Sequence, residues 1–512
     1  MRSTFHGIEV SKRGLFAQQS ALNTTGHNIA NANTEGYTRQ RVNMQATPGI
    51  PYPAMSNSTE PGLLGTGVNV VSLQRIREEF LDVQLRTENK HYGYWEARRD
   101  VLQKIEGIMN EPSDTGLQKV MDELWKSWQD LSQNPESLSA RAVVRQRAIA
   151  VTETFAALNT SLTELQRDLD NVVETKVIDI NSMAQQLANL NRQIGDFVPH
   201  GYQPNDLYDQ RDLLLDKLAK MADIKVTNMG NTGMIQVTID GKELVNGRNA
   251  VVMATAKDPV TGFSNITLGG APFIPESGGL LGSFEARGIA VLDPNTGQTS
   301  FQGPVPDMIN KLNTLLESMV KEVNDLHQTG MNLNDIKARE ANPGAALEAL
   351  PFFVQKDATK PLSASNVQVN PRILASLNAI AAAQAEDPAT STGVSFYGDG
   401  RNALAIAGLK FKMLTLSSVS GGVETTTLDD FYRYTIAQLG VDSQEAKRME
   451  KNSELLVGQV DTNRQSVSGV SIDEEMSEMV KYQHAYSASA RVMTSMDEIL
   501  DKVINGMGRV GL

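Results

Sequence analysis

The side chains that most often carry out chemistry in proteins are few in this sequence and lie far apart. It contains no Cys, which excludes thiolate zinc sites, iron–sulfur clusters, disulfides and cysteine nucleophiles. None of its six histidines forms an HExxH motif or a pair at helical ligand spacing. The GxSxG and GxxxxGK[ST] motifs are also missing. We therefore predict no catalytic, cofactor-binding or metal-binding residues, and a protein that is not an enzyme.

Charge and hydropathy argue against two further kinds of partner. The 512 residues include 47 Lys and Arg against 60 Asp and Glu, a formal net charge of −13. Nucleic acid is not an expected partner, because neutralising phosphates requires clustered basic side chains. No run approaches the ~18 apolar residues that cross a membrane. The amino end also has no apolar block of the kind found in a cleaved secretory signal. Taken alone, these observations predict a cytoplasmic protein with no membrane partner.

The remaining chemistry is that of assembly, because apolar side chains recur at a spacing of seven near both ends of the chain. Such a narrow stripe is typical of a coiled-coil seam rather than of the wide apolar face of a globular helix. We predict two terminal helices that pair as a coiled coil and whose seams form an assembly interface. The seam residues are Ile8, Leu15, Leu22 and Ile29 at the amino end, and Met479, Tyr482, Tyr486, Met493, Met496, Leu500 and Val503 at the carboxyl end.

A turn is predicted directly after the first seam. Asn31 and Asn33 belong to a residue type that competes for backbone hydrogen bonds, and Gly36 permits a positive φ angle. Tyr37 offers an aromatic anchor beside them. On physical grounds alone, an ordinary helix end followed by a loop is the simpler interpretation of these four residues.

The two ends carry opposite charges. Residues 1–45 hold five basic and two acidic residues, a net +3, and residues 471–512 hold seven acidic and four basic residues, a net −3. Ser471 and Glu474 predict a capping box at the start of the last helix. Opposite charge favours pairing of the terminal helices, and the alternative is two unrelated surface helices.

Between the ends, helical and β patterns alternate. Pro112 and Pro135 interrupt long helical segments, and the alternating residues 235–239 precede an Asp240-Gly241 hairpin turn. The predicted fold class is mainly α with an inserted β domain, in an elongated multi-domain chain whose ends lie side by side. The predicted parts are a terminal coiled-coil region (1–60 and 466–512), a long-helix domain (61–222, 304–330 and 400–465), a β-rich domain (223–303) and an irregular insertion with short helices (331–399).

Motifs at both ends resemble those of a known protein family. Residues 14–22 (GLFAQQSAL) and 28–37 (NIANANTEGY) are similar to the amino-terminal motif of bacterial flagellar axial proteins, which include rod, hook and hook-associated proteins. Residues 468–476 (SGVSIDEEM) and 481–492 (KYQHAYSASARV) resemble the carboxyl-terminal motif of the same family, and especially of its hook-associated members. The resemblance adds Asn31, Asn33, Gly36 and Tyr37 to the predicted assembly interface.

This resemblance implies a structural role at the junction between hook and filament. The implied partners are further copies of the chain, hook protein, a second hook–filament junction protein, and a flagellar export chaperone at the carboxyl-terminal segment. Export through the flagellar type III apparatus needs no cleaved signal, so the expected location changes from cytoplasmic to extracellular. No cofactor is implied.

Three alternatives remain at this stage. The nearest is another axial protein, such as hook or distal rod protein. A secreted enzyme on an axial scaffold would need an acid pair or a metal triad in residues 223–399, and the sequence suggests none. A coiled-coil adhesin is the third. Since isolated helices are marginally stable in water, we also expect the terminal segments to be largely unfolded or fluctuating in the monomer and to order as paired helices when neighbouring subunits pack against them.

Overall fold

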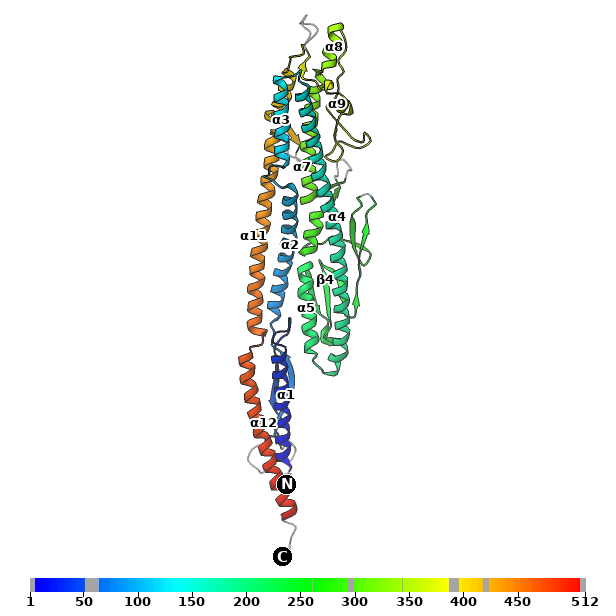
Figure 1. The fold of residues 1–512 in the computed structure, drawn as a ribbon. Coiled ribbons are helices and arrows are strands. Elements are labelled where there is room, and N and C mark those ends of the chain that lie inside the picture. The colour runs from blue at the N-terminus through cyan, green and yellow to red at the C-terminus, as the bar shows by residue number, and fades with distance from the viewer. Residues whose placement is uncertain are drawn as a thin grey trace.

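The structure is a computed structural model that describes residues 5–50, 64–259, 261–292, 299–342, 344–385, 396–417 and 423–506. The molecule is mostly helical with several small sheets, and it is elongated (Figure 1). Helices α1 (His6–Ala30) and α12 (Ile472–Asp501), from opposite ends of the chain, lie together at one tip. Helix α8 (Leu333–Ala341) lies at the other tip. Parts of the predicted terminal region and insertion, residues 51–60, 386–395 and 507–512, lie outside the described residues.

Long helices form the body of the molecule. The predicted interruptions at Pro112 and Pro135 are confirmed, because the first lies between α2 and α3 and the second between α3 and α4. Proline cannot donate the backbone hydrogen bond that a helix interior requires. The helices of the body are α2 (Glu79–Met109), α3 (Leu117–Gln133), α4 (Leu138–Phe197), α5 (Asn205–Met221), α7 (Pro304–Thr329) and α11 (Leu428–Ser468).

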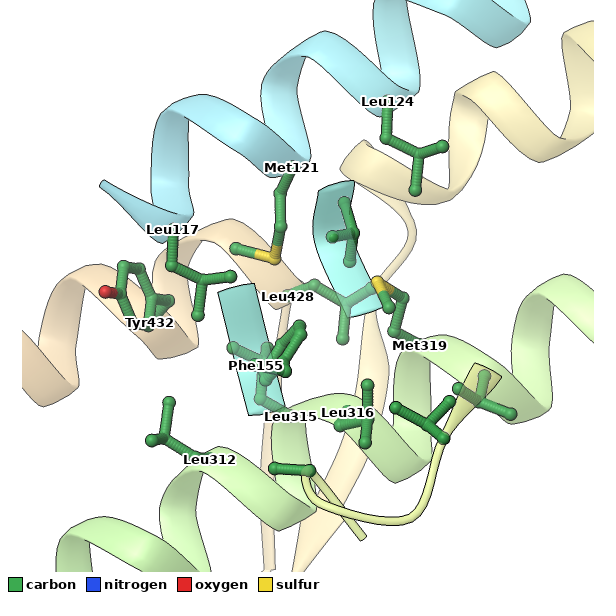
Figure 2. Close-up of a cluster of buried hydrophobic side chains, with 14 of the residues drawn as sticks. Leu117, Met121, Leu124, Phe155, Leu312, Leu315, Leu316, Met319, Leu428 and Tyr432 are labelled. Atoms are coloured by element: carbon green, nitrogen blue, oxygen red, sulfur yellow. The ribbon is translucent and has the colours of Figure 1, made fainter. Parts of the chain in front are cut away.

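The main hydrophobic core lies where α3, α4, α7 and α11 meet (Figure 2). Its side chains point inward from all four helices, for example Leu124, Phe155, Leu316 and Leu428. Each is almost fully shielded from solvent. Burial of apolar side chains from segments far apart in sequence stabilises this part of the molecule within a single chain.

A second core lies under the β-rich segment. Strands β3 (Ile224–Asn228), β4 (Ile235–Ile239), β5 (Lys242–Asn246) and β6 (Asn249–Ala250) form one antiparallel sheet in sequence order. Strands β7 (Met253–Lys257), β8 (Ser264–Leu268) and β9 (Ala271–Phe273) form another. Both contribute to a core with the second half of α4, α5 and α6 (Gly278–Arg287).

The predicted hairpin turn in this segment is confirmed. Asp240 and Gly241 connect β4 to β5, with φ angles of 46° and 76°. Two successive positive φ angles suit the right-handed twist of the flanking strands.

Residues 330–385 combine short helices with two-stranded pairs, among them β12 (Gly330–Met331) with β15 (Ala383–Gln384) and β13 (Phe353–Val354) with β14 (Gln368–Val369). The short helix α9 (Pro371–Ala375) follows β14. The buried His327 of α7 fixes this segment in place. Its Nδ1 donates to the Leu350 carbonyl oxygen at 2.6 Å, and its Nε2 accepts from the Ala381 amide at 2.9 Å.

Three features differ from the sequence-based expectations. Residues 400–465, predicted as part of the long-helix domain, are not helical throughout: α10 (Arg401–Ala407) passes into a 3-10 turn, η4 (Gly408–Phe411), and then into strand β16 (Leu414–Ser417). Strand β16 forms an antiparallel pair with β17 (Val423–Thr426). A further two-stranded pair, β10 (Ile289–Leu292) with β11 (Thr299–Gln302), precedes α7.

The second and third differences lie between the first two helices. Strands β1 (Gln40–Ala46) and β2 (Val68–Arg75) form an antiparallel pair that the sequence analysis did not identify. Residues 68–75 fall within the predicted long-helix domain but form β2, and α2 begins only at Glu79. This strand pair, here called the hairpin, runs beside α1, and its end at Gln40 and Arg75 lies nearest the body.

Candidate assembly surface and its joint to the body

Helices α1 and α12, here called the terminal pair, run antiparallel in close contact. A Cβ atom at Gly7 would lie 2.9 Å from the Met496 sulfur, and one at Gly14 would lie 3.1 Å from the Ser489 hydroxyl oxygen. At the other end of the pair, the Asn28 side chain contacts Glu475. Glycine at positions 7 and 14 therefore allows the two backbones to approach closely.

The predicted seam residues are distributed differently on the two helices. On α12, Met479, Tyr482, Met493 and Met496 are half-buried and Leu500 is buried, whereas Tyr486 is exposed. Val503, in the π-helical turn that follows α12, is also exposed. On α1, the predicted residues Ile8, Leu15, Leu22 and Ile29 are all half-buried. The residues that α1 buries are small or polar: Ser11, Ala17, Ala21, Thr24, Thr25 and Asn28.

The predicted turn after α1 is present and packs on the body. Asn31 donates from Nδ2 to the His27 carbonyl oxygen at 3.0 Å and accepts from Thr34, whereas Asn33 is exposed. Gly36 has a φ angle of 80°, and a Cβ atom there would lie 3.1 Å from Leu213 of α5. Both the positive φ and the close approach favour glycine at this position.

Asn28, which the sequence analysis did not include among the site residues, is the centre of this region and is 1% exposed. Its Oδ1 accepts from the Tyr37 hydroxyl at 2.8 Å and from the Gln40 amide at 3.0 Å. Its Nδ2 donates to the Gln40 carbonyl oxygen and to Glu475 Oε2, both at 2.9 Å. A single amide thus connects α1, β1 and α12. Its place in the Asn-rich motif was the available signal, but the sequence does not distinguish it from Asn31 and Asn33.

Burial and the nearby carboxylates of Asp206, Asp209 and Glu475 raise the pKa of Tyr37 above its ordinary value. The Tyr37 hydroxyl therefore keeps its proton and remains the donor to Asn28. The ring also meets His27 edge to face, with centroids 5.5 Å apart.

The expected capping box at the start of α12 is wrong, because Ser471 makes no side-chain capping hydrogen bond. The acidic side chains of the first turn instead reach across to Arg39, which directly precedes β1. Arg39 donates from Nε to Glu475 and from a terminal guanidinium nitrogen to Glu474, both at 2.6 Å. Glu475 is almost fully buried, so this bond is shielded from solvent on the Glu475 side. An arginine that holds two carboxylates competes successfully with a local cap.

The carboxylates of α5 connect the hairpin to the body. Arg75 at the end of β2 donates to Asp209 at 2.8 Å and to Asp212 at 2.9 Å. Burial alone would raise the pKa of Asp212, but the charges of Arg77, Arg75 and Arg86 outweigh it and hold that pKa below its ordinary value. The Thr38 amide also donates to Asp209, at 3.0 Å.

The last turns of α11 join the same network. Arg464 donates to Asp216 at 2.5 Å and to Asp461 at 2.8 Å. Arg77 donates two hydrogen bonds to the Asp82 carboxylate, at 2.6 and 2.8 Å. We call the set of polar contacts around Asn28, Arg39, Arg75, Arg77, Arg464 and the carboxylates of α5 the joint.

The described residues contain no group of three or more His, Cys, Asp or Glu side chains that could hold a metal ion. Among the same residues, no helix is long and apolar enough to cross a membrane. The terminal pair brings helices from opposite ends of the sequence together at one tip of an elongated, mostly helical molecule.

Comparisons with known proteins identify the family. The chain is 39% identical over 99% of its length to flagellar hook-associated protein 1 of Bacillus subtilis (strain 168), and the match covers 99% of that relative. It is 26% identical to the Salmonella typhimurium protein of the same name, over 97% of this chain and 99% of the relative. The chain belongs to the flagellar hook-associated protein 1 family, and it is a structural component of the bacterial flagellum.

Family models match separate parts of the chain. Residues 102–346 match the flagellar hook-associated protein FlgK helical domain, residues 8–38 the flagella basal body rod protein, and residues 463–506 the flagellar basal body rod FlgEFG protein C-terminal. The solved structure of the flagellar hook junction protein FlgK from Burkholderia pseudomallei has a similar fold. It matches with a TM-score of 0.58 and 16% identity, and covers 75% of this chain and 100% of the solved chain. The predicted resemblance to flagellar axial proteins is confirmed. Membership of this family implies self-assembly with other flagellar components, and the relatives' names describe structural proteins rather than enzymes.

Proposed function

We propose that this protein forms a layer at the junction between hook and filament, and that it assembles through its terminal helices. The observation that carries the proposal is the position of α1 and α12. These helices from opposite ends of the chain lie together at one tip and expose apolar side chains there, among them Phe16 and Met476. Apolar side chains that one chain leaves uncovered are available for contact with neighbouring subunits.

The proposal also covers how the terminal helices pair, which proteins adjoin the layer and how the protein leaves the cell. The terminal helices pair as a coiled coil in the assembled layer, around the predicted seam residues. The neighbours are hook protein on one side and a second junction protein on the other. The protein reaches the cell exterior through the flagellar type III apparatus, and an export chaperone holds the carboxyl-terminal segment beforehand. The four-part division of the chain stated above is part of the same proposal.

Several structural observations support assembly by the ends rather than by the body. The joint attaches the terminal pair to the body through ion pairs and hydrogen bonds, such as Arg39 with Glu475 and Arg75 with Asp209. The main core lies elsewhere, among α3, α4, α7 and α11. The body therefore has its own source of stability, independent of the apolar side chains on the terminal pair.

A deletion tests this division. Removal of residues 1–35 and 471–512 should leave a soluble body with a cooperative thermal transition. The same deletion in a strain without its own copy of the protein should give cells that build hooks but no filaments, as seen by electron microscopy. A body that no longer melts cooperatively, or filaments that still form, would contradict assembly through the terminal helices. Cells of the deletion strain that lack hooks as well would indicate hook or rod protein instead.

A further inference from the structure

The segment formed by α10 and the 3-10 turn η4 is apolar on both of its sides. Its inward side belongs to the main core, where Ala403, Ile406 and Leu409 are each at most 2% exposed. Its outward side carries Leu404 and Phe411, which are 56% and 76% exposed. A surface helix normally turns polar residues outward, and a helix that is apolar all round is normally covered on every side. The sequence of this segment is therefore typical of one that is covered on its outward side as well.

The exposed apolar surface continues beyond Phe411. Met413, two residues further on, is 60% exposed, and Phe396, in the turn before α10, is 65% exposed. We call Leu404, Phe411 and Met413 the far patch. Helix α10 packs against α3, and the exposed residues of α3 are all polar: Lys119, Lys126, Gln129, Asp130 and Gln133. An apolar outward surface is thus a property of the far patch and not of this part of the body in general.

The basic side chains around the far patch are neutralised within the chain. Three of them each pair with a carboxylate: Lys410 with Asp122, Lys412 with Glu322, and Arg401 with Asp399. A partner with acidic groups would have to compete with these existing pairs. Charge complementarity therefore favours an uncharged, apolar partner over an acidic surface.

The nearest polar segments of the chain do not supply such a partner. Residues 386–395 (EDPATSTGVS) and 418–422 (SVSGG) each contain one valine as their only large apolar residue. Burial of apolar surface is favourable in proportion to its area, and one valine offers little area against three large side chains. We therefore look for the occupant of the far patch in another molecule.

The far patch lies at a distance from the terminal pair that exceeds the length of the pair. Strand β16 follows Met413 and pairs with β17, which leads into the start of α11, and the joint lies at the other end of α11. The 41 residues of α11 span about 60 Å, whereas the 30 residues of α12 span about 45 Å. Figure 1 shows these two helices one after the other along the long axis. In a layer built by terminal pairs, the far patch would therefore lie beyond the height of those pairs.

We propose that the far patch binds an apolar, uncharged surface of a different axial protein, in the layer that adjoins the far end of the body. This inference rests on the proposed function, and it adds which surface of the chain meets a neighbouring layer. Contact between the far patches of two copies would require a two-fold axis. Copies that all point the same way along a tube are not related by such an axis.

Photo-crosslinking tests which molecule covers the patch. Two full-length forms carry a photoreactive amino acid, one in place of Phe411 and the control in place of Lys126 on the polar surface of α3. Each is produced in a strain without its own copy, and the isolated flagella are irradiated. We expect position 411 to give a product with a different flagellar axial protein, identified by mass spectrometry, and position 126 to give none. A product that joins two copies of this chain, or equal yields from both positions, would overturn the inference.

A double substitution tests whether the contact is needed. Leu404→Ser with Phe411→Ser should leave the thermal melting of the isolated protein unchanged, because both side chains are exposed. It should reduce the number of filaments by about tenfold or more, since loss of an aromatic anchor weakens an interface by at least that factor. Ile178→Ser is the control, because Ile178 is 65% exposed on α4, and it should keep filaments at wild-type numbers.

The remaining outcomes separate this inference from the proposed function. Wild-type filament numbers in the double variant would contradict the role of the far patch. Self-association of the free protein that the double substitution abolishes would mean that a second copy covers the patch, and would overturn the inference. Absence of the unsubstituted protein from isolated flagella would instead contradict the proposed function.

Discussion

The helical body and the terminal pair are both made of long helices, but their contacts differ. In the body, Phe155 and Leu316 are completely buried among apolar neighbours from four helices (Figure 2). In the terminal pair, α1 buries alanines, hydroxyl side chains and one asparagine, and α12 buries only Glu475 and Leu500. Apolar burial contributes about 25 cal/mol per Å². The body therefore draws its stability from its own chain, whereas the terminal pair leaves much of its apolar surface uncovered by that chain.

The contacts of the joint differ from those of both the body and the terminal pair. Its contacts are charged and polar, and their geometry depends on side chains such as Asn28, Arg39 and Asp212, which are held from several directions. Partly buried ion pairs add little net stability, but removing one partner is costly. The joint therefore fixes how the terminal pair is placed on the body more than it holds the molecule together. Four predictions test this contrast, from the largest expected effect to the smallest.

The largest effect should come from the core of the body. Phe155→Ala should lower the free energy of unfolding by about 3–5 kcal/mol, because it removes a fully buried ring and leaves a cavity. Phe16→Ala, the same change on the terminal pair, should lower it by less than about 0.5 kcal/mol, because that ring is exposed. Urea unfolding followed by circular dichroism measures both. Equal losses for the two variants would remove the distinction between the regions.

The next prediction concerns pH and acts on the body alone. Burial lowers the pKa of His327 to about 4, and the charge of Arg141 adds to this effect. The unfolded chain binds a proton at about pH 6.5, so it takes up protons before the folded chain does. Stability from this group is complete above pH 6.5 and falls by about 3 kcal/mol as the pH decreases to about 4. Thermal melts between pH 7 and 4 measure the change.

The control for this prediction is His327→Gln, which cannot titrate and should weaken the dependence on pH over that range. His200→Gln should keep it, because His200 is exposed. Hydrogen exchange in α1 should not follow the titration, since His327 contacts residues 350 and 381 and not the terminal pair. An unchanged pH dependence in His327→Gln would refute the assignment.

The sequence predicted more about the body than about the joint. Helical periodicity and the positions of Pro112 and Pro135 located α3 and α4, and Asp240-Gly241 located a hairpin, because these signals are local. Strands β1 and β2 were missed because they pair with each other across residues 47–67. Pairing between segments so far apart in the sequence leaves no local pattern.

The local nature of sequence signals also limited what could be predicted about the terminal pair and the joint. The seven-residue spacing identified the terminal helices, but it did not show that small residues of α1 face α12 while the apolar seam lies one position further round. The capping box was wrong because Glu474 and Glu475 bind Arg39, which is more than 400 residues away in the chain. Of three similar asparagines, only the structure singles out Asn28, whose partners come from β1 and α12.

The joint should show an intermediate effect that depends on position within one motif. Asn28→Ala leaves the buried Gln40 amide and carbonyl groups without their partner, so it should cost about 2 kcal/mol. Asn33→Ala in the same motif should cost less than about 0.5 kcal/mol, because Asn33 is exposed. Hydrogen exchange in the last turn of α1 and in β1 measures the local loss. If both variants behave alike, Asn28 does not organise the joint.

The smallest effect on stability should accompany the largest effect on assembly. Leu22 on α1 and Met493 on α12 are both half-buried. Leu22→Asp and Met493→Asp should each change the free energy of unfolding of the isolated protein by about 1 kcal/mol or less. Both should nevertheless prevent filament growth, because a charge placed between neighbouring subunits would be buried without a partner. Filament counts by electron microscopy, in a strain without its own copy, provide the second measurement.

Leu22→Met is the matched control, since it keeps the apolar character and the approximate volume of the side chain. It should restore filaments to wild-type numbers. Two results would argue against the contrast between the regions. A loss of monomer stability as large as that of Phe155→Ala would mean that the seam stabilises the chain itself. Normal filaments on cells carrying Leu22→Asp would mean that the seam is not covered in the flagellum. A stable monomer that cannot assemble is expected only if the apolar side chains of the terminal pair contact other subunits.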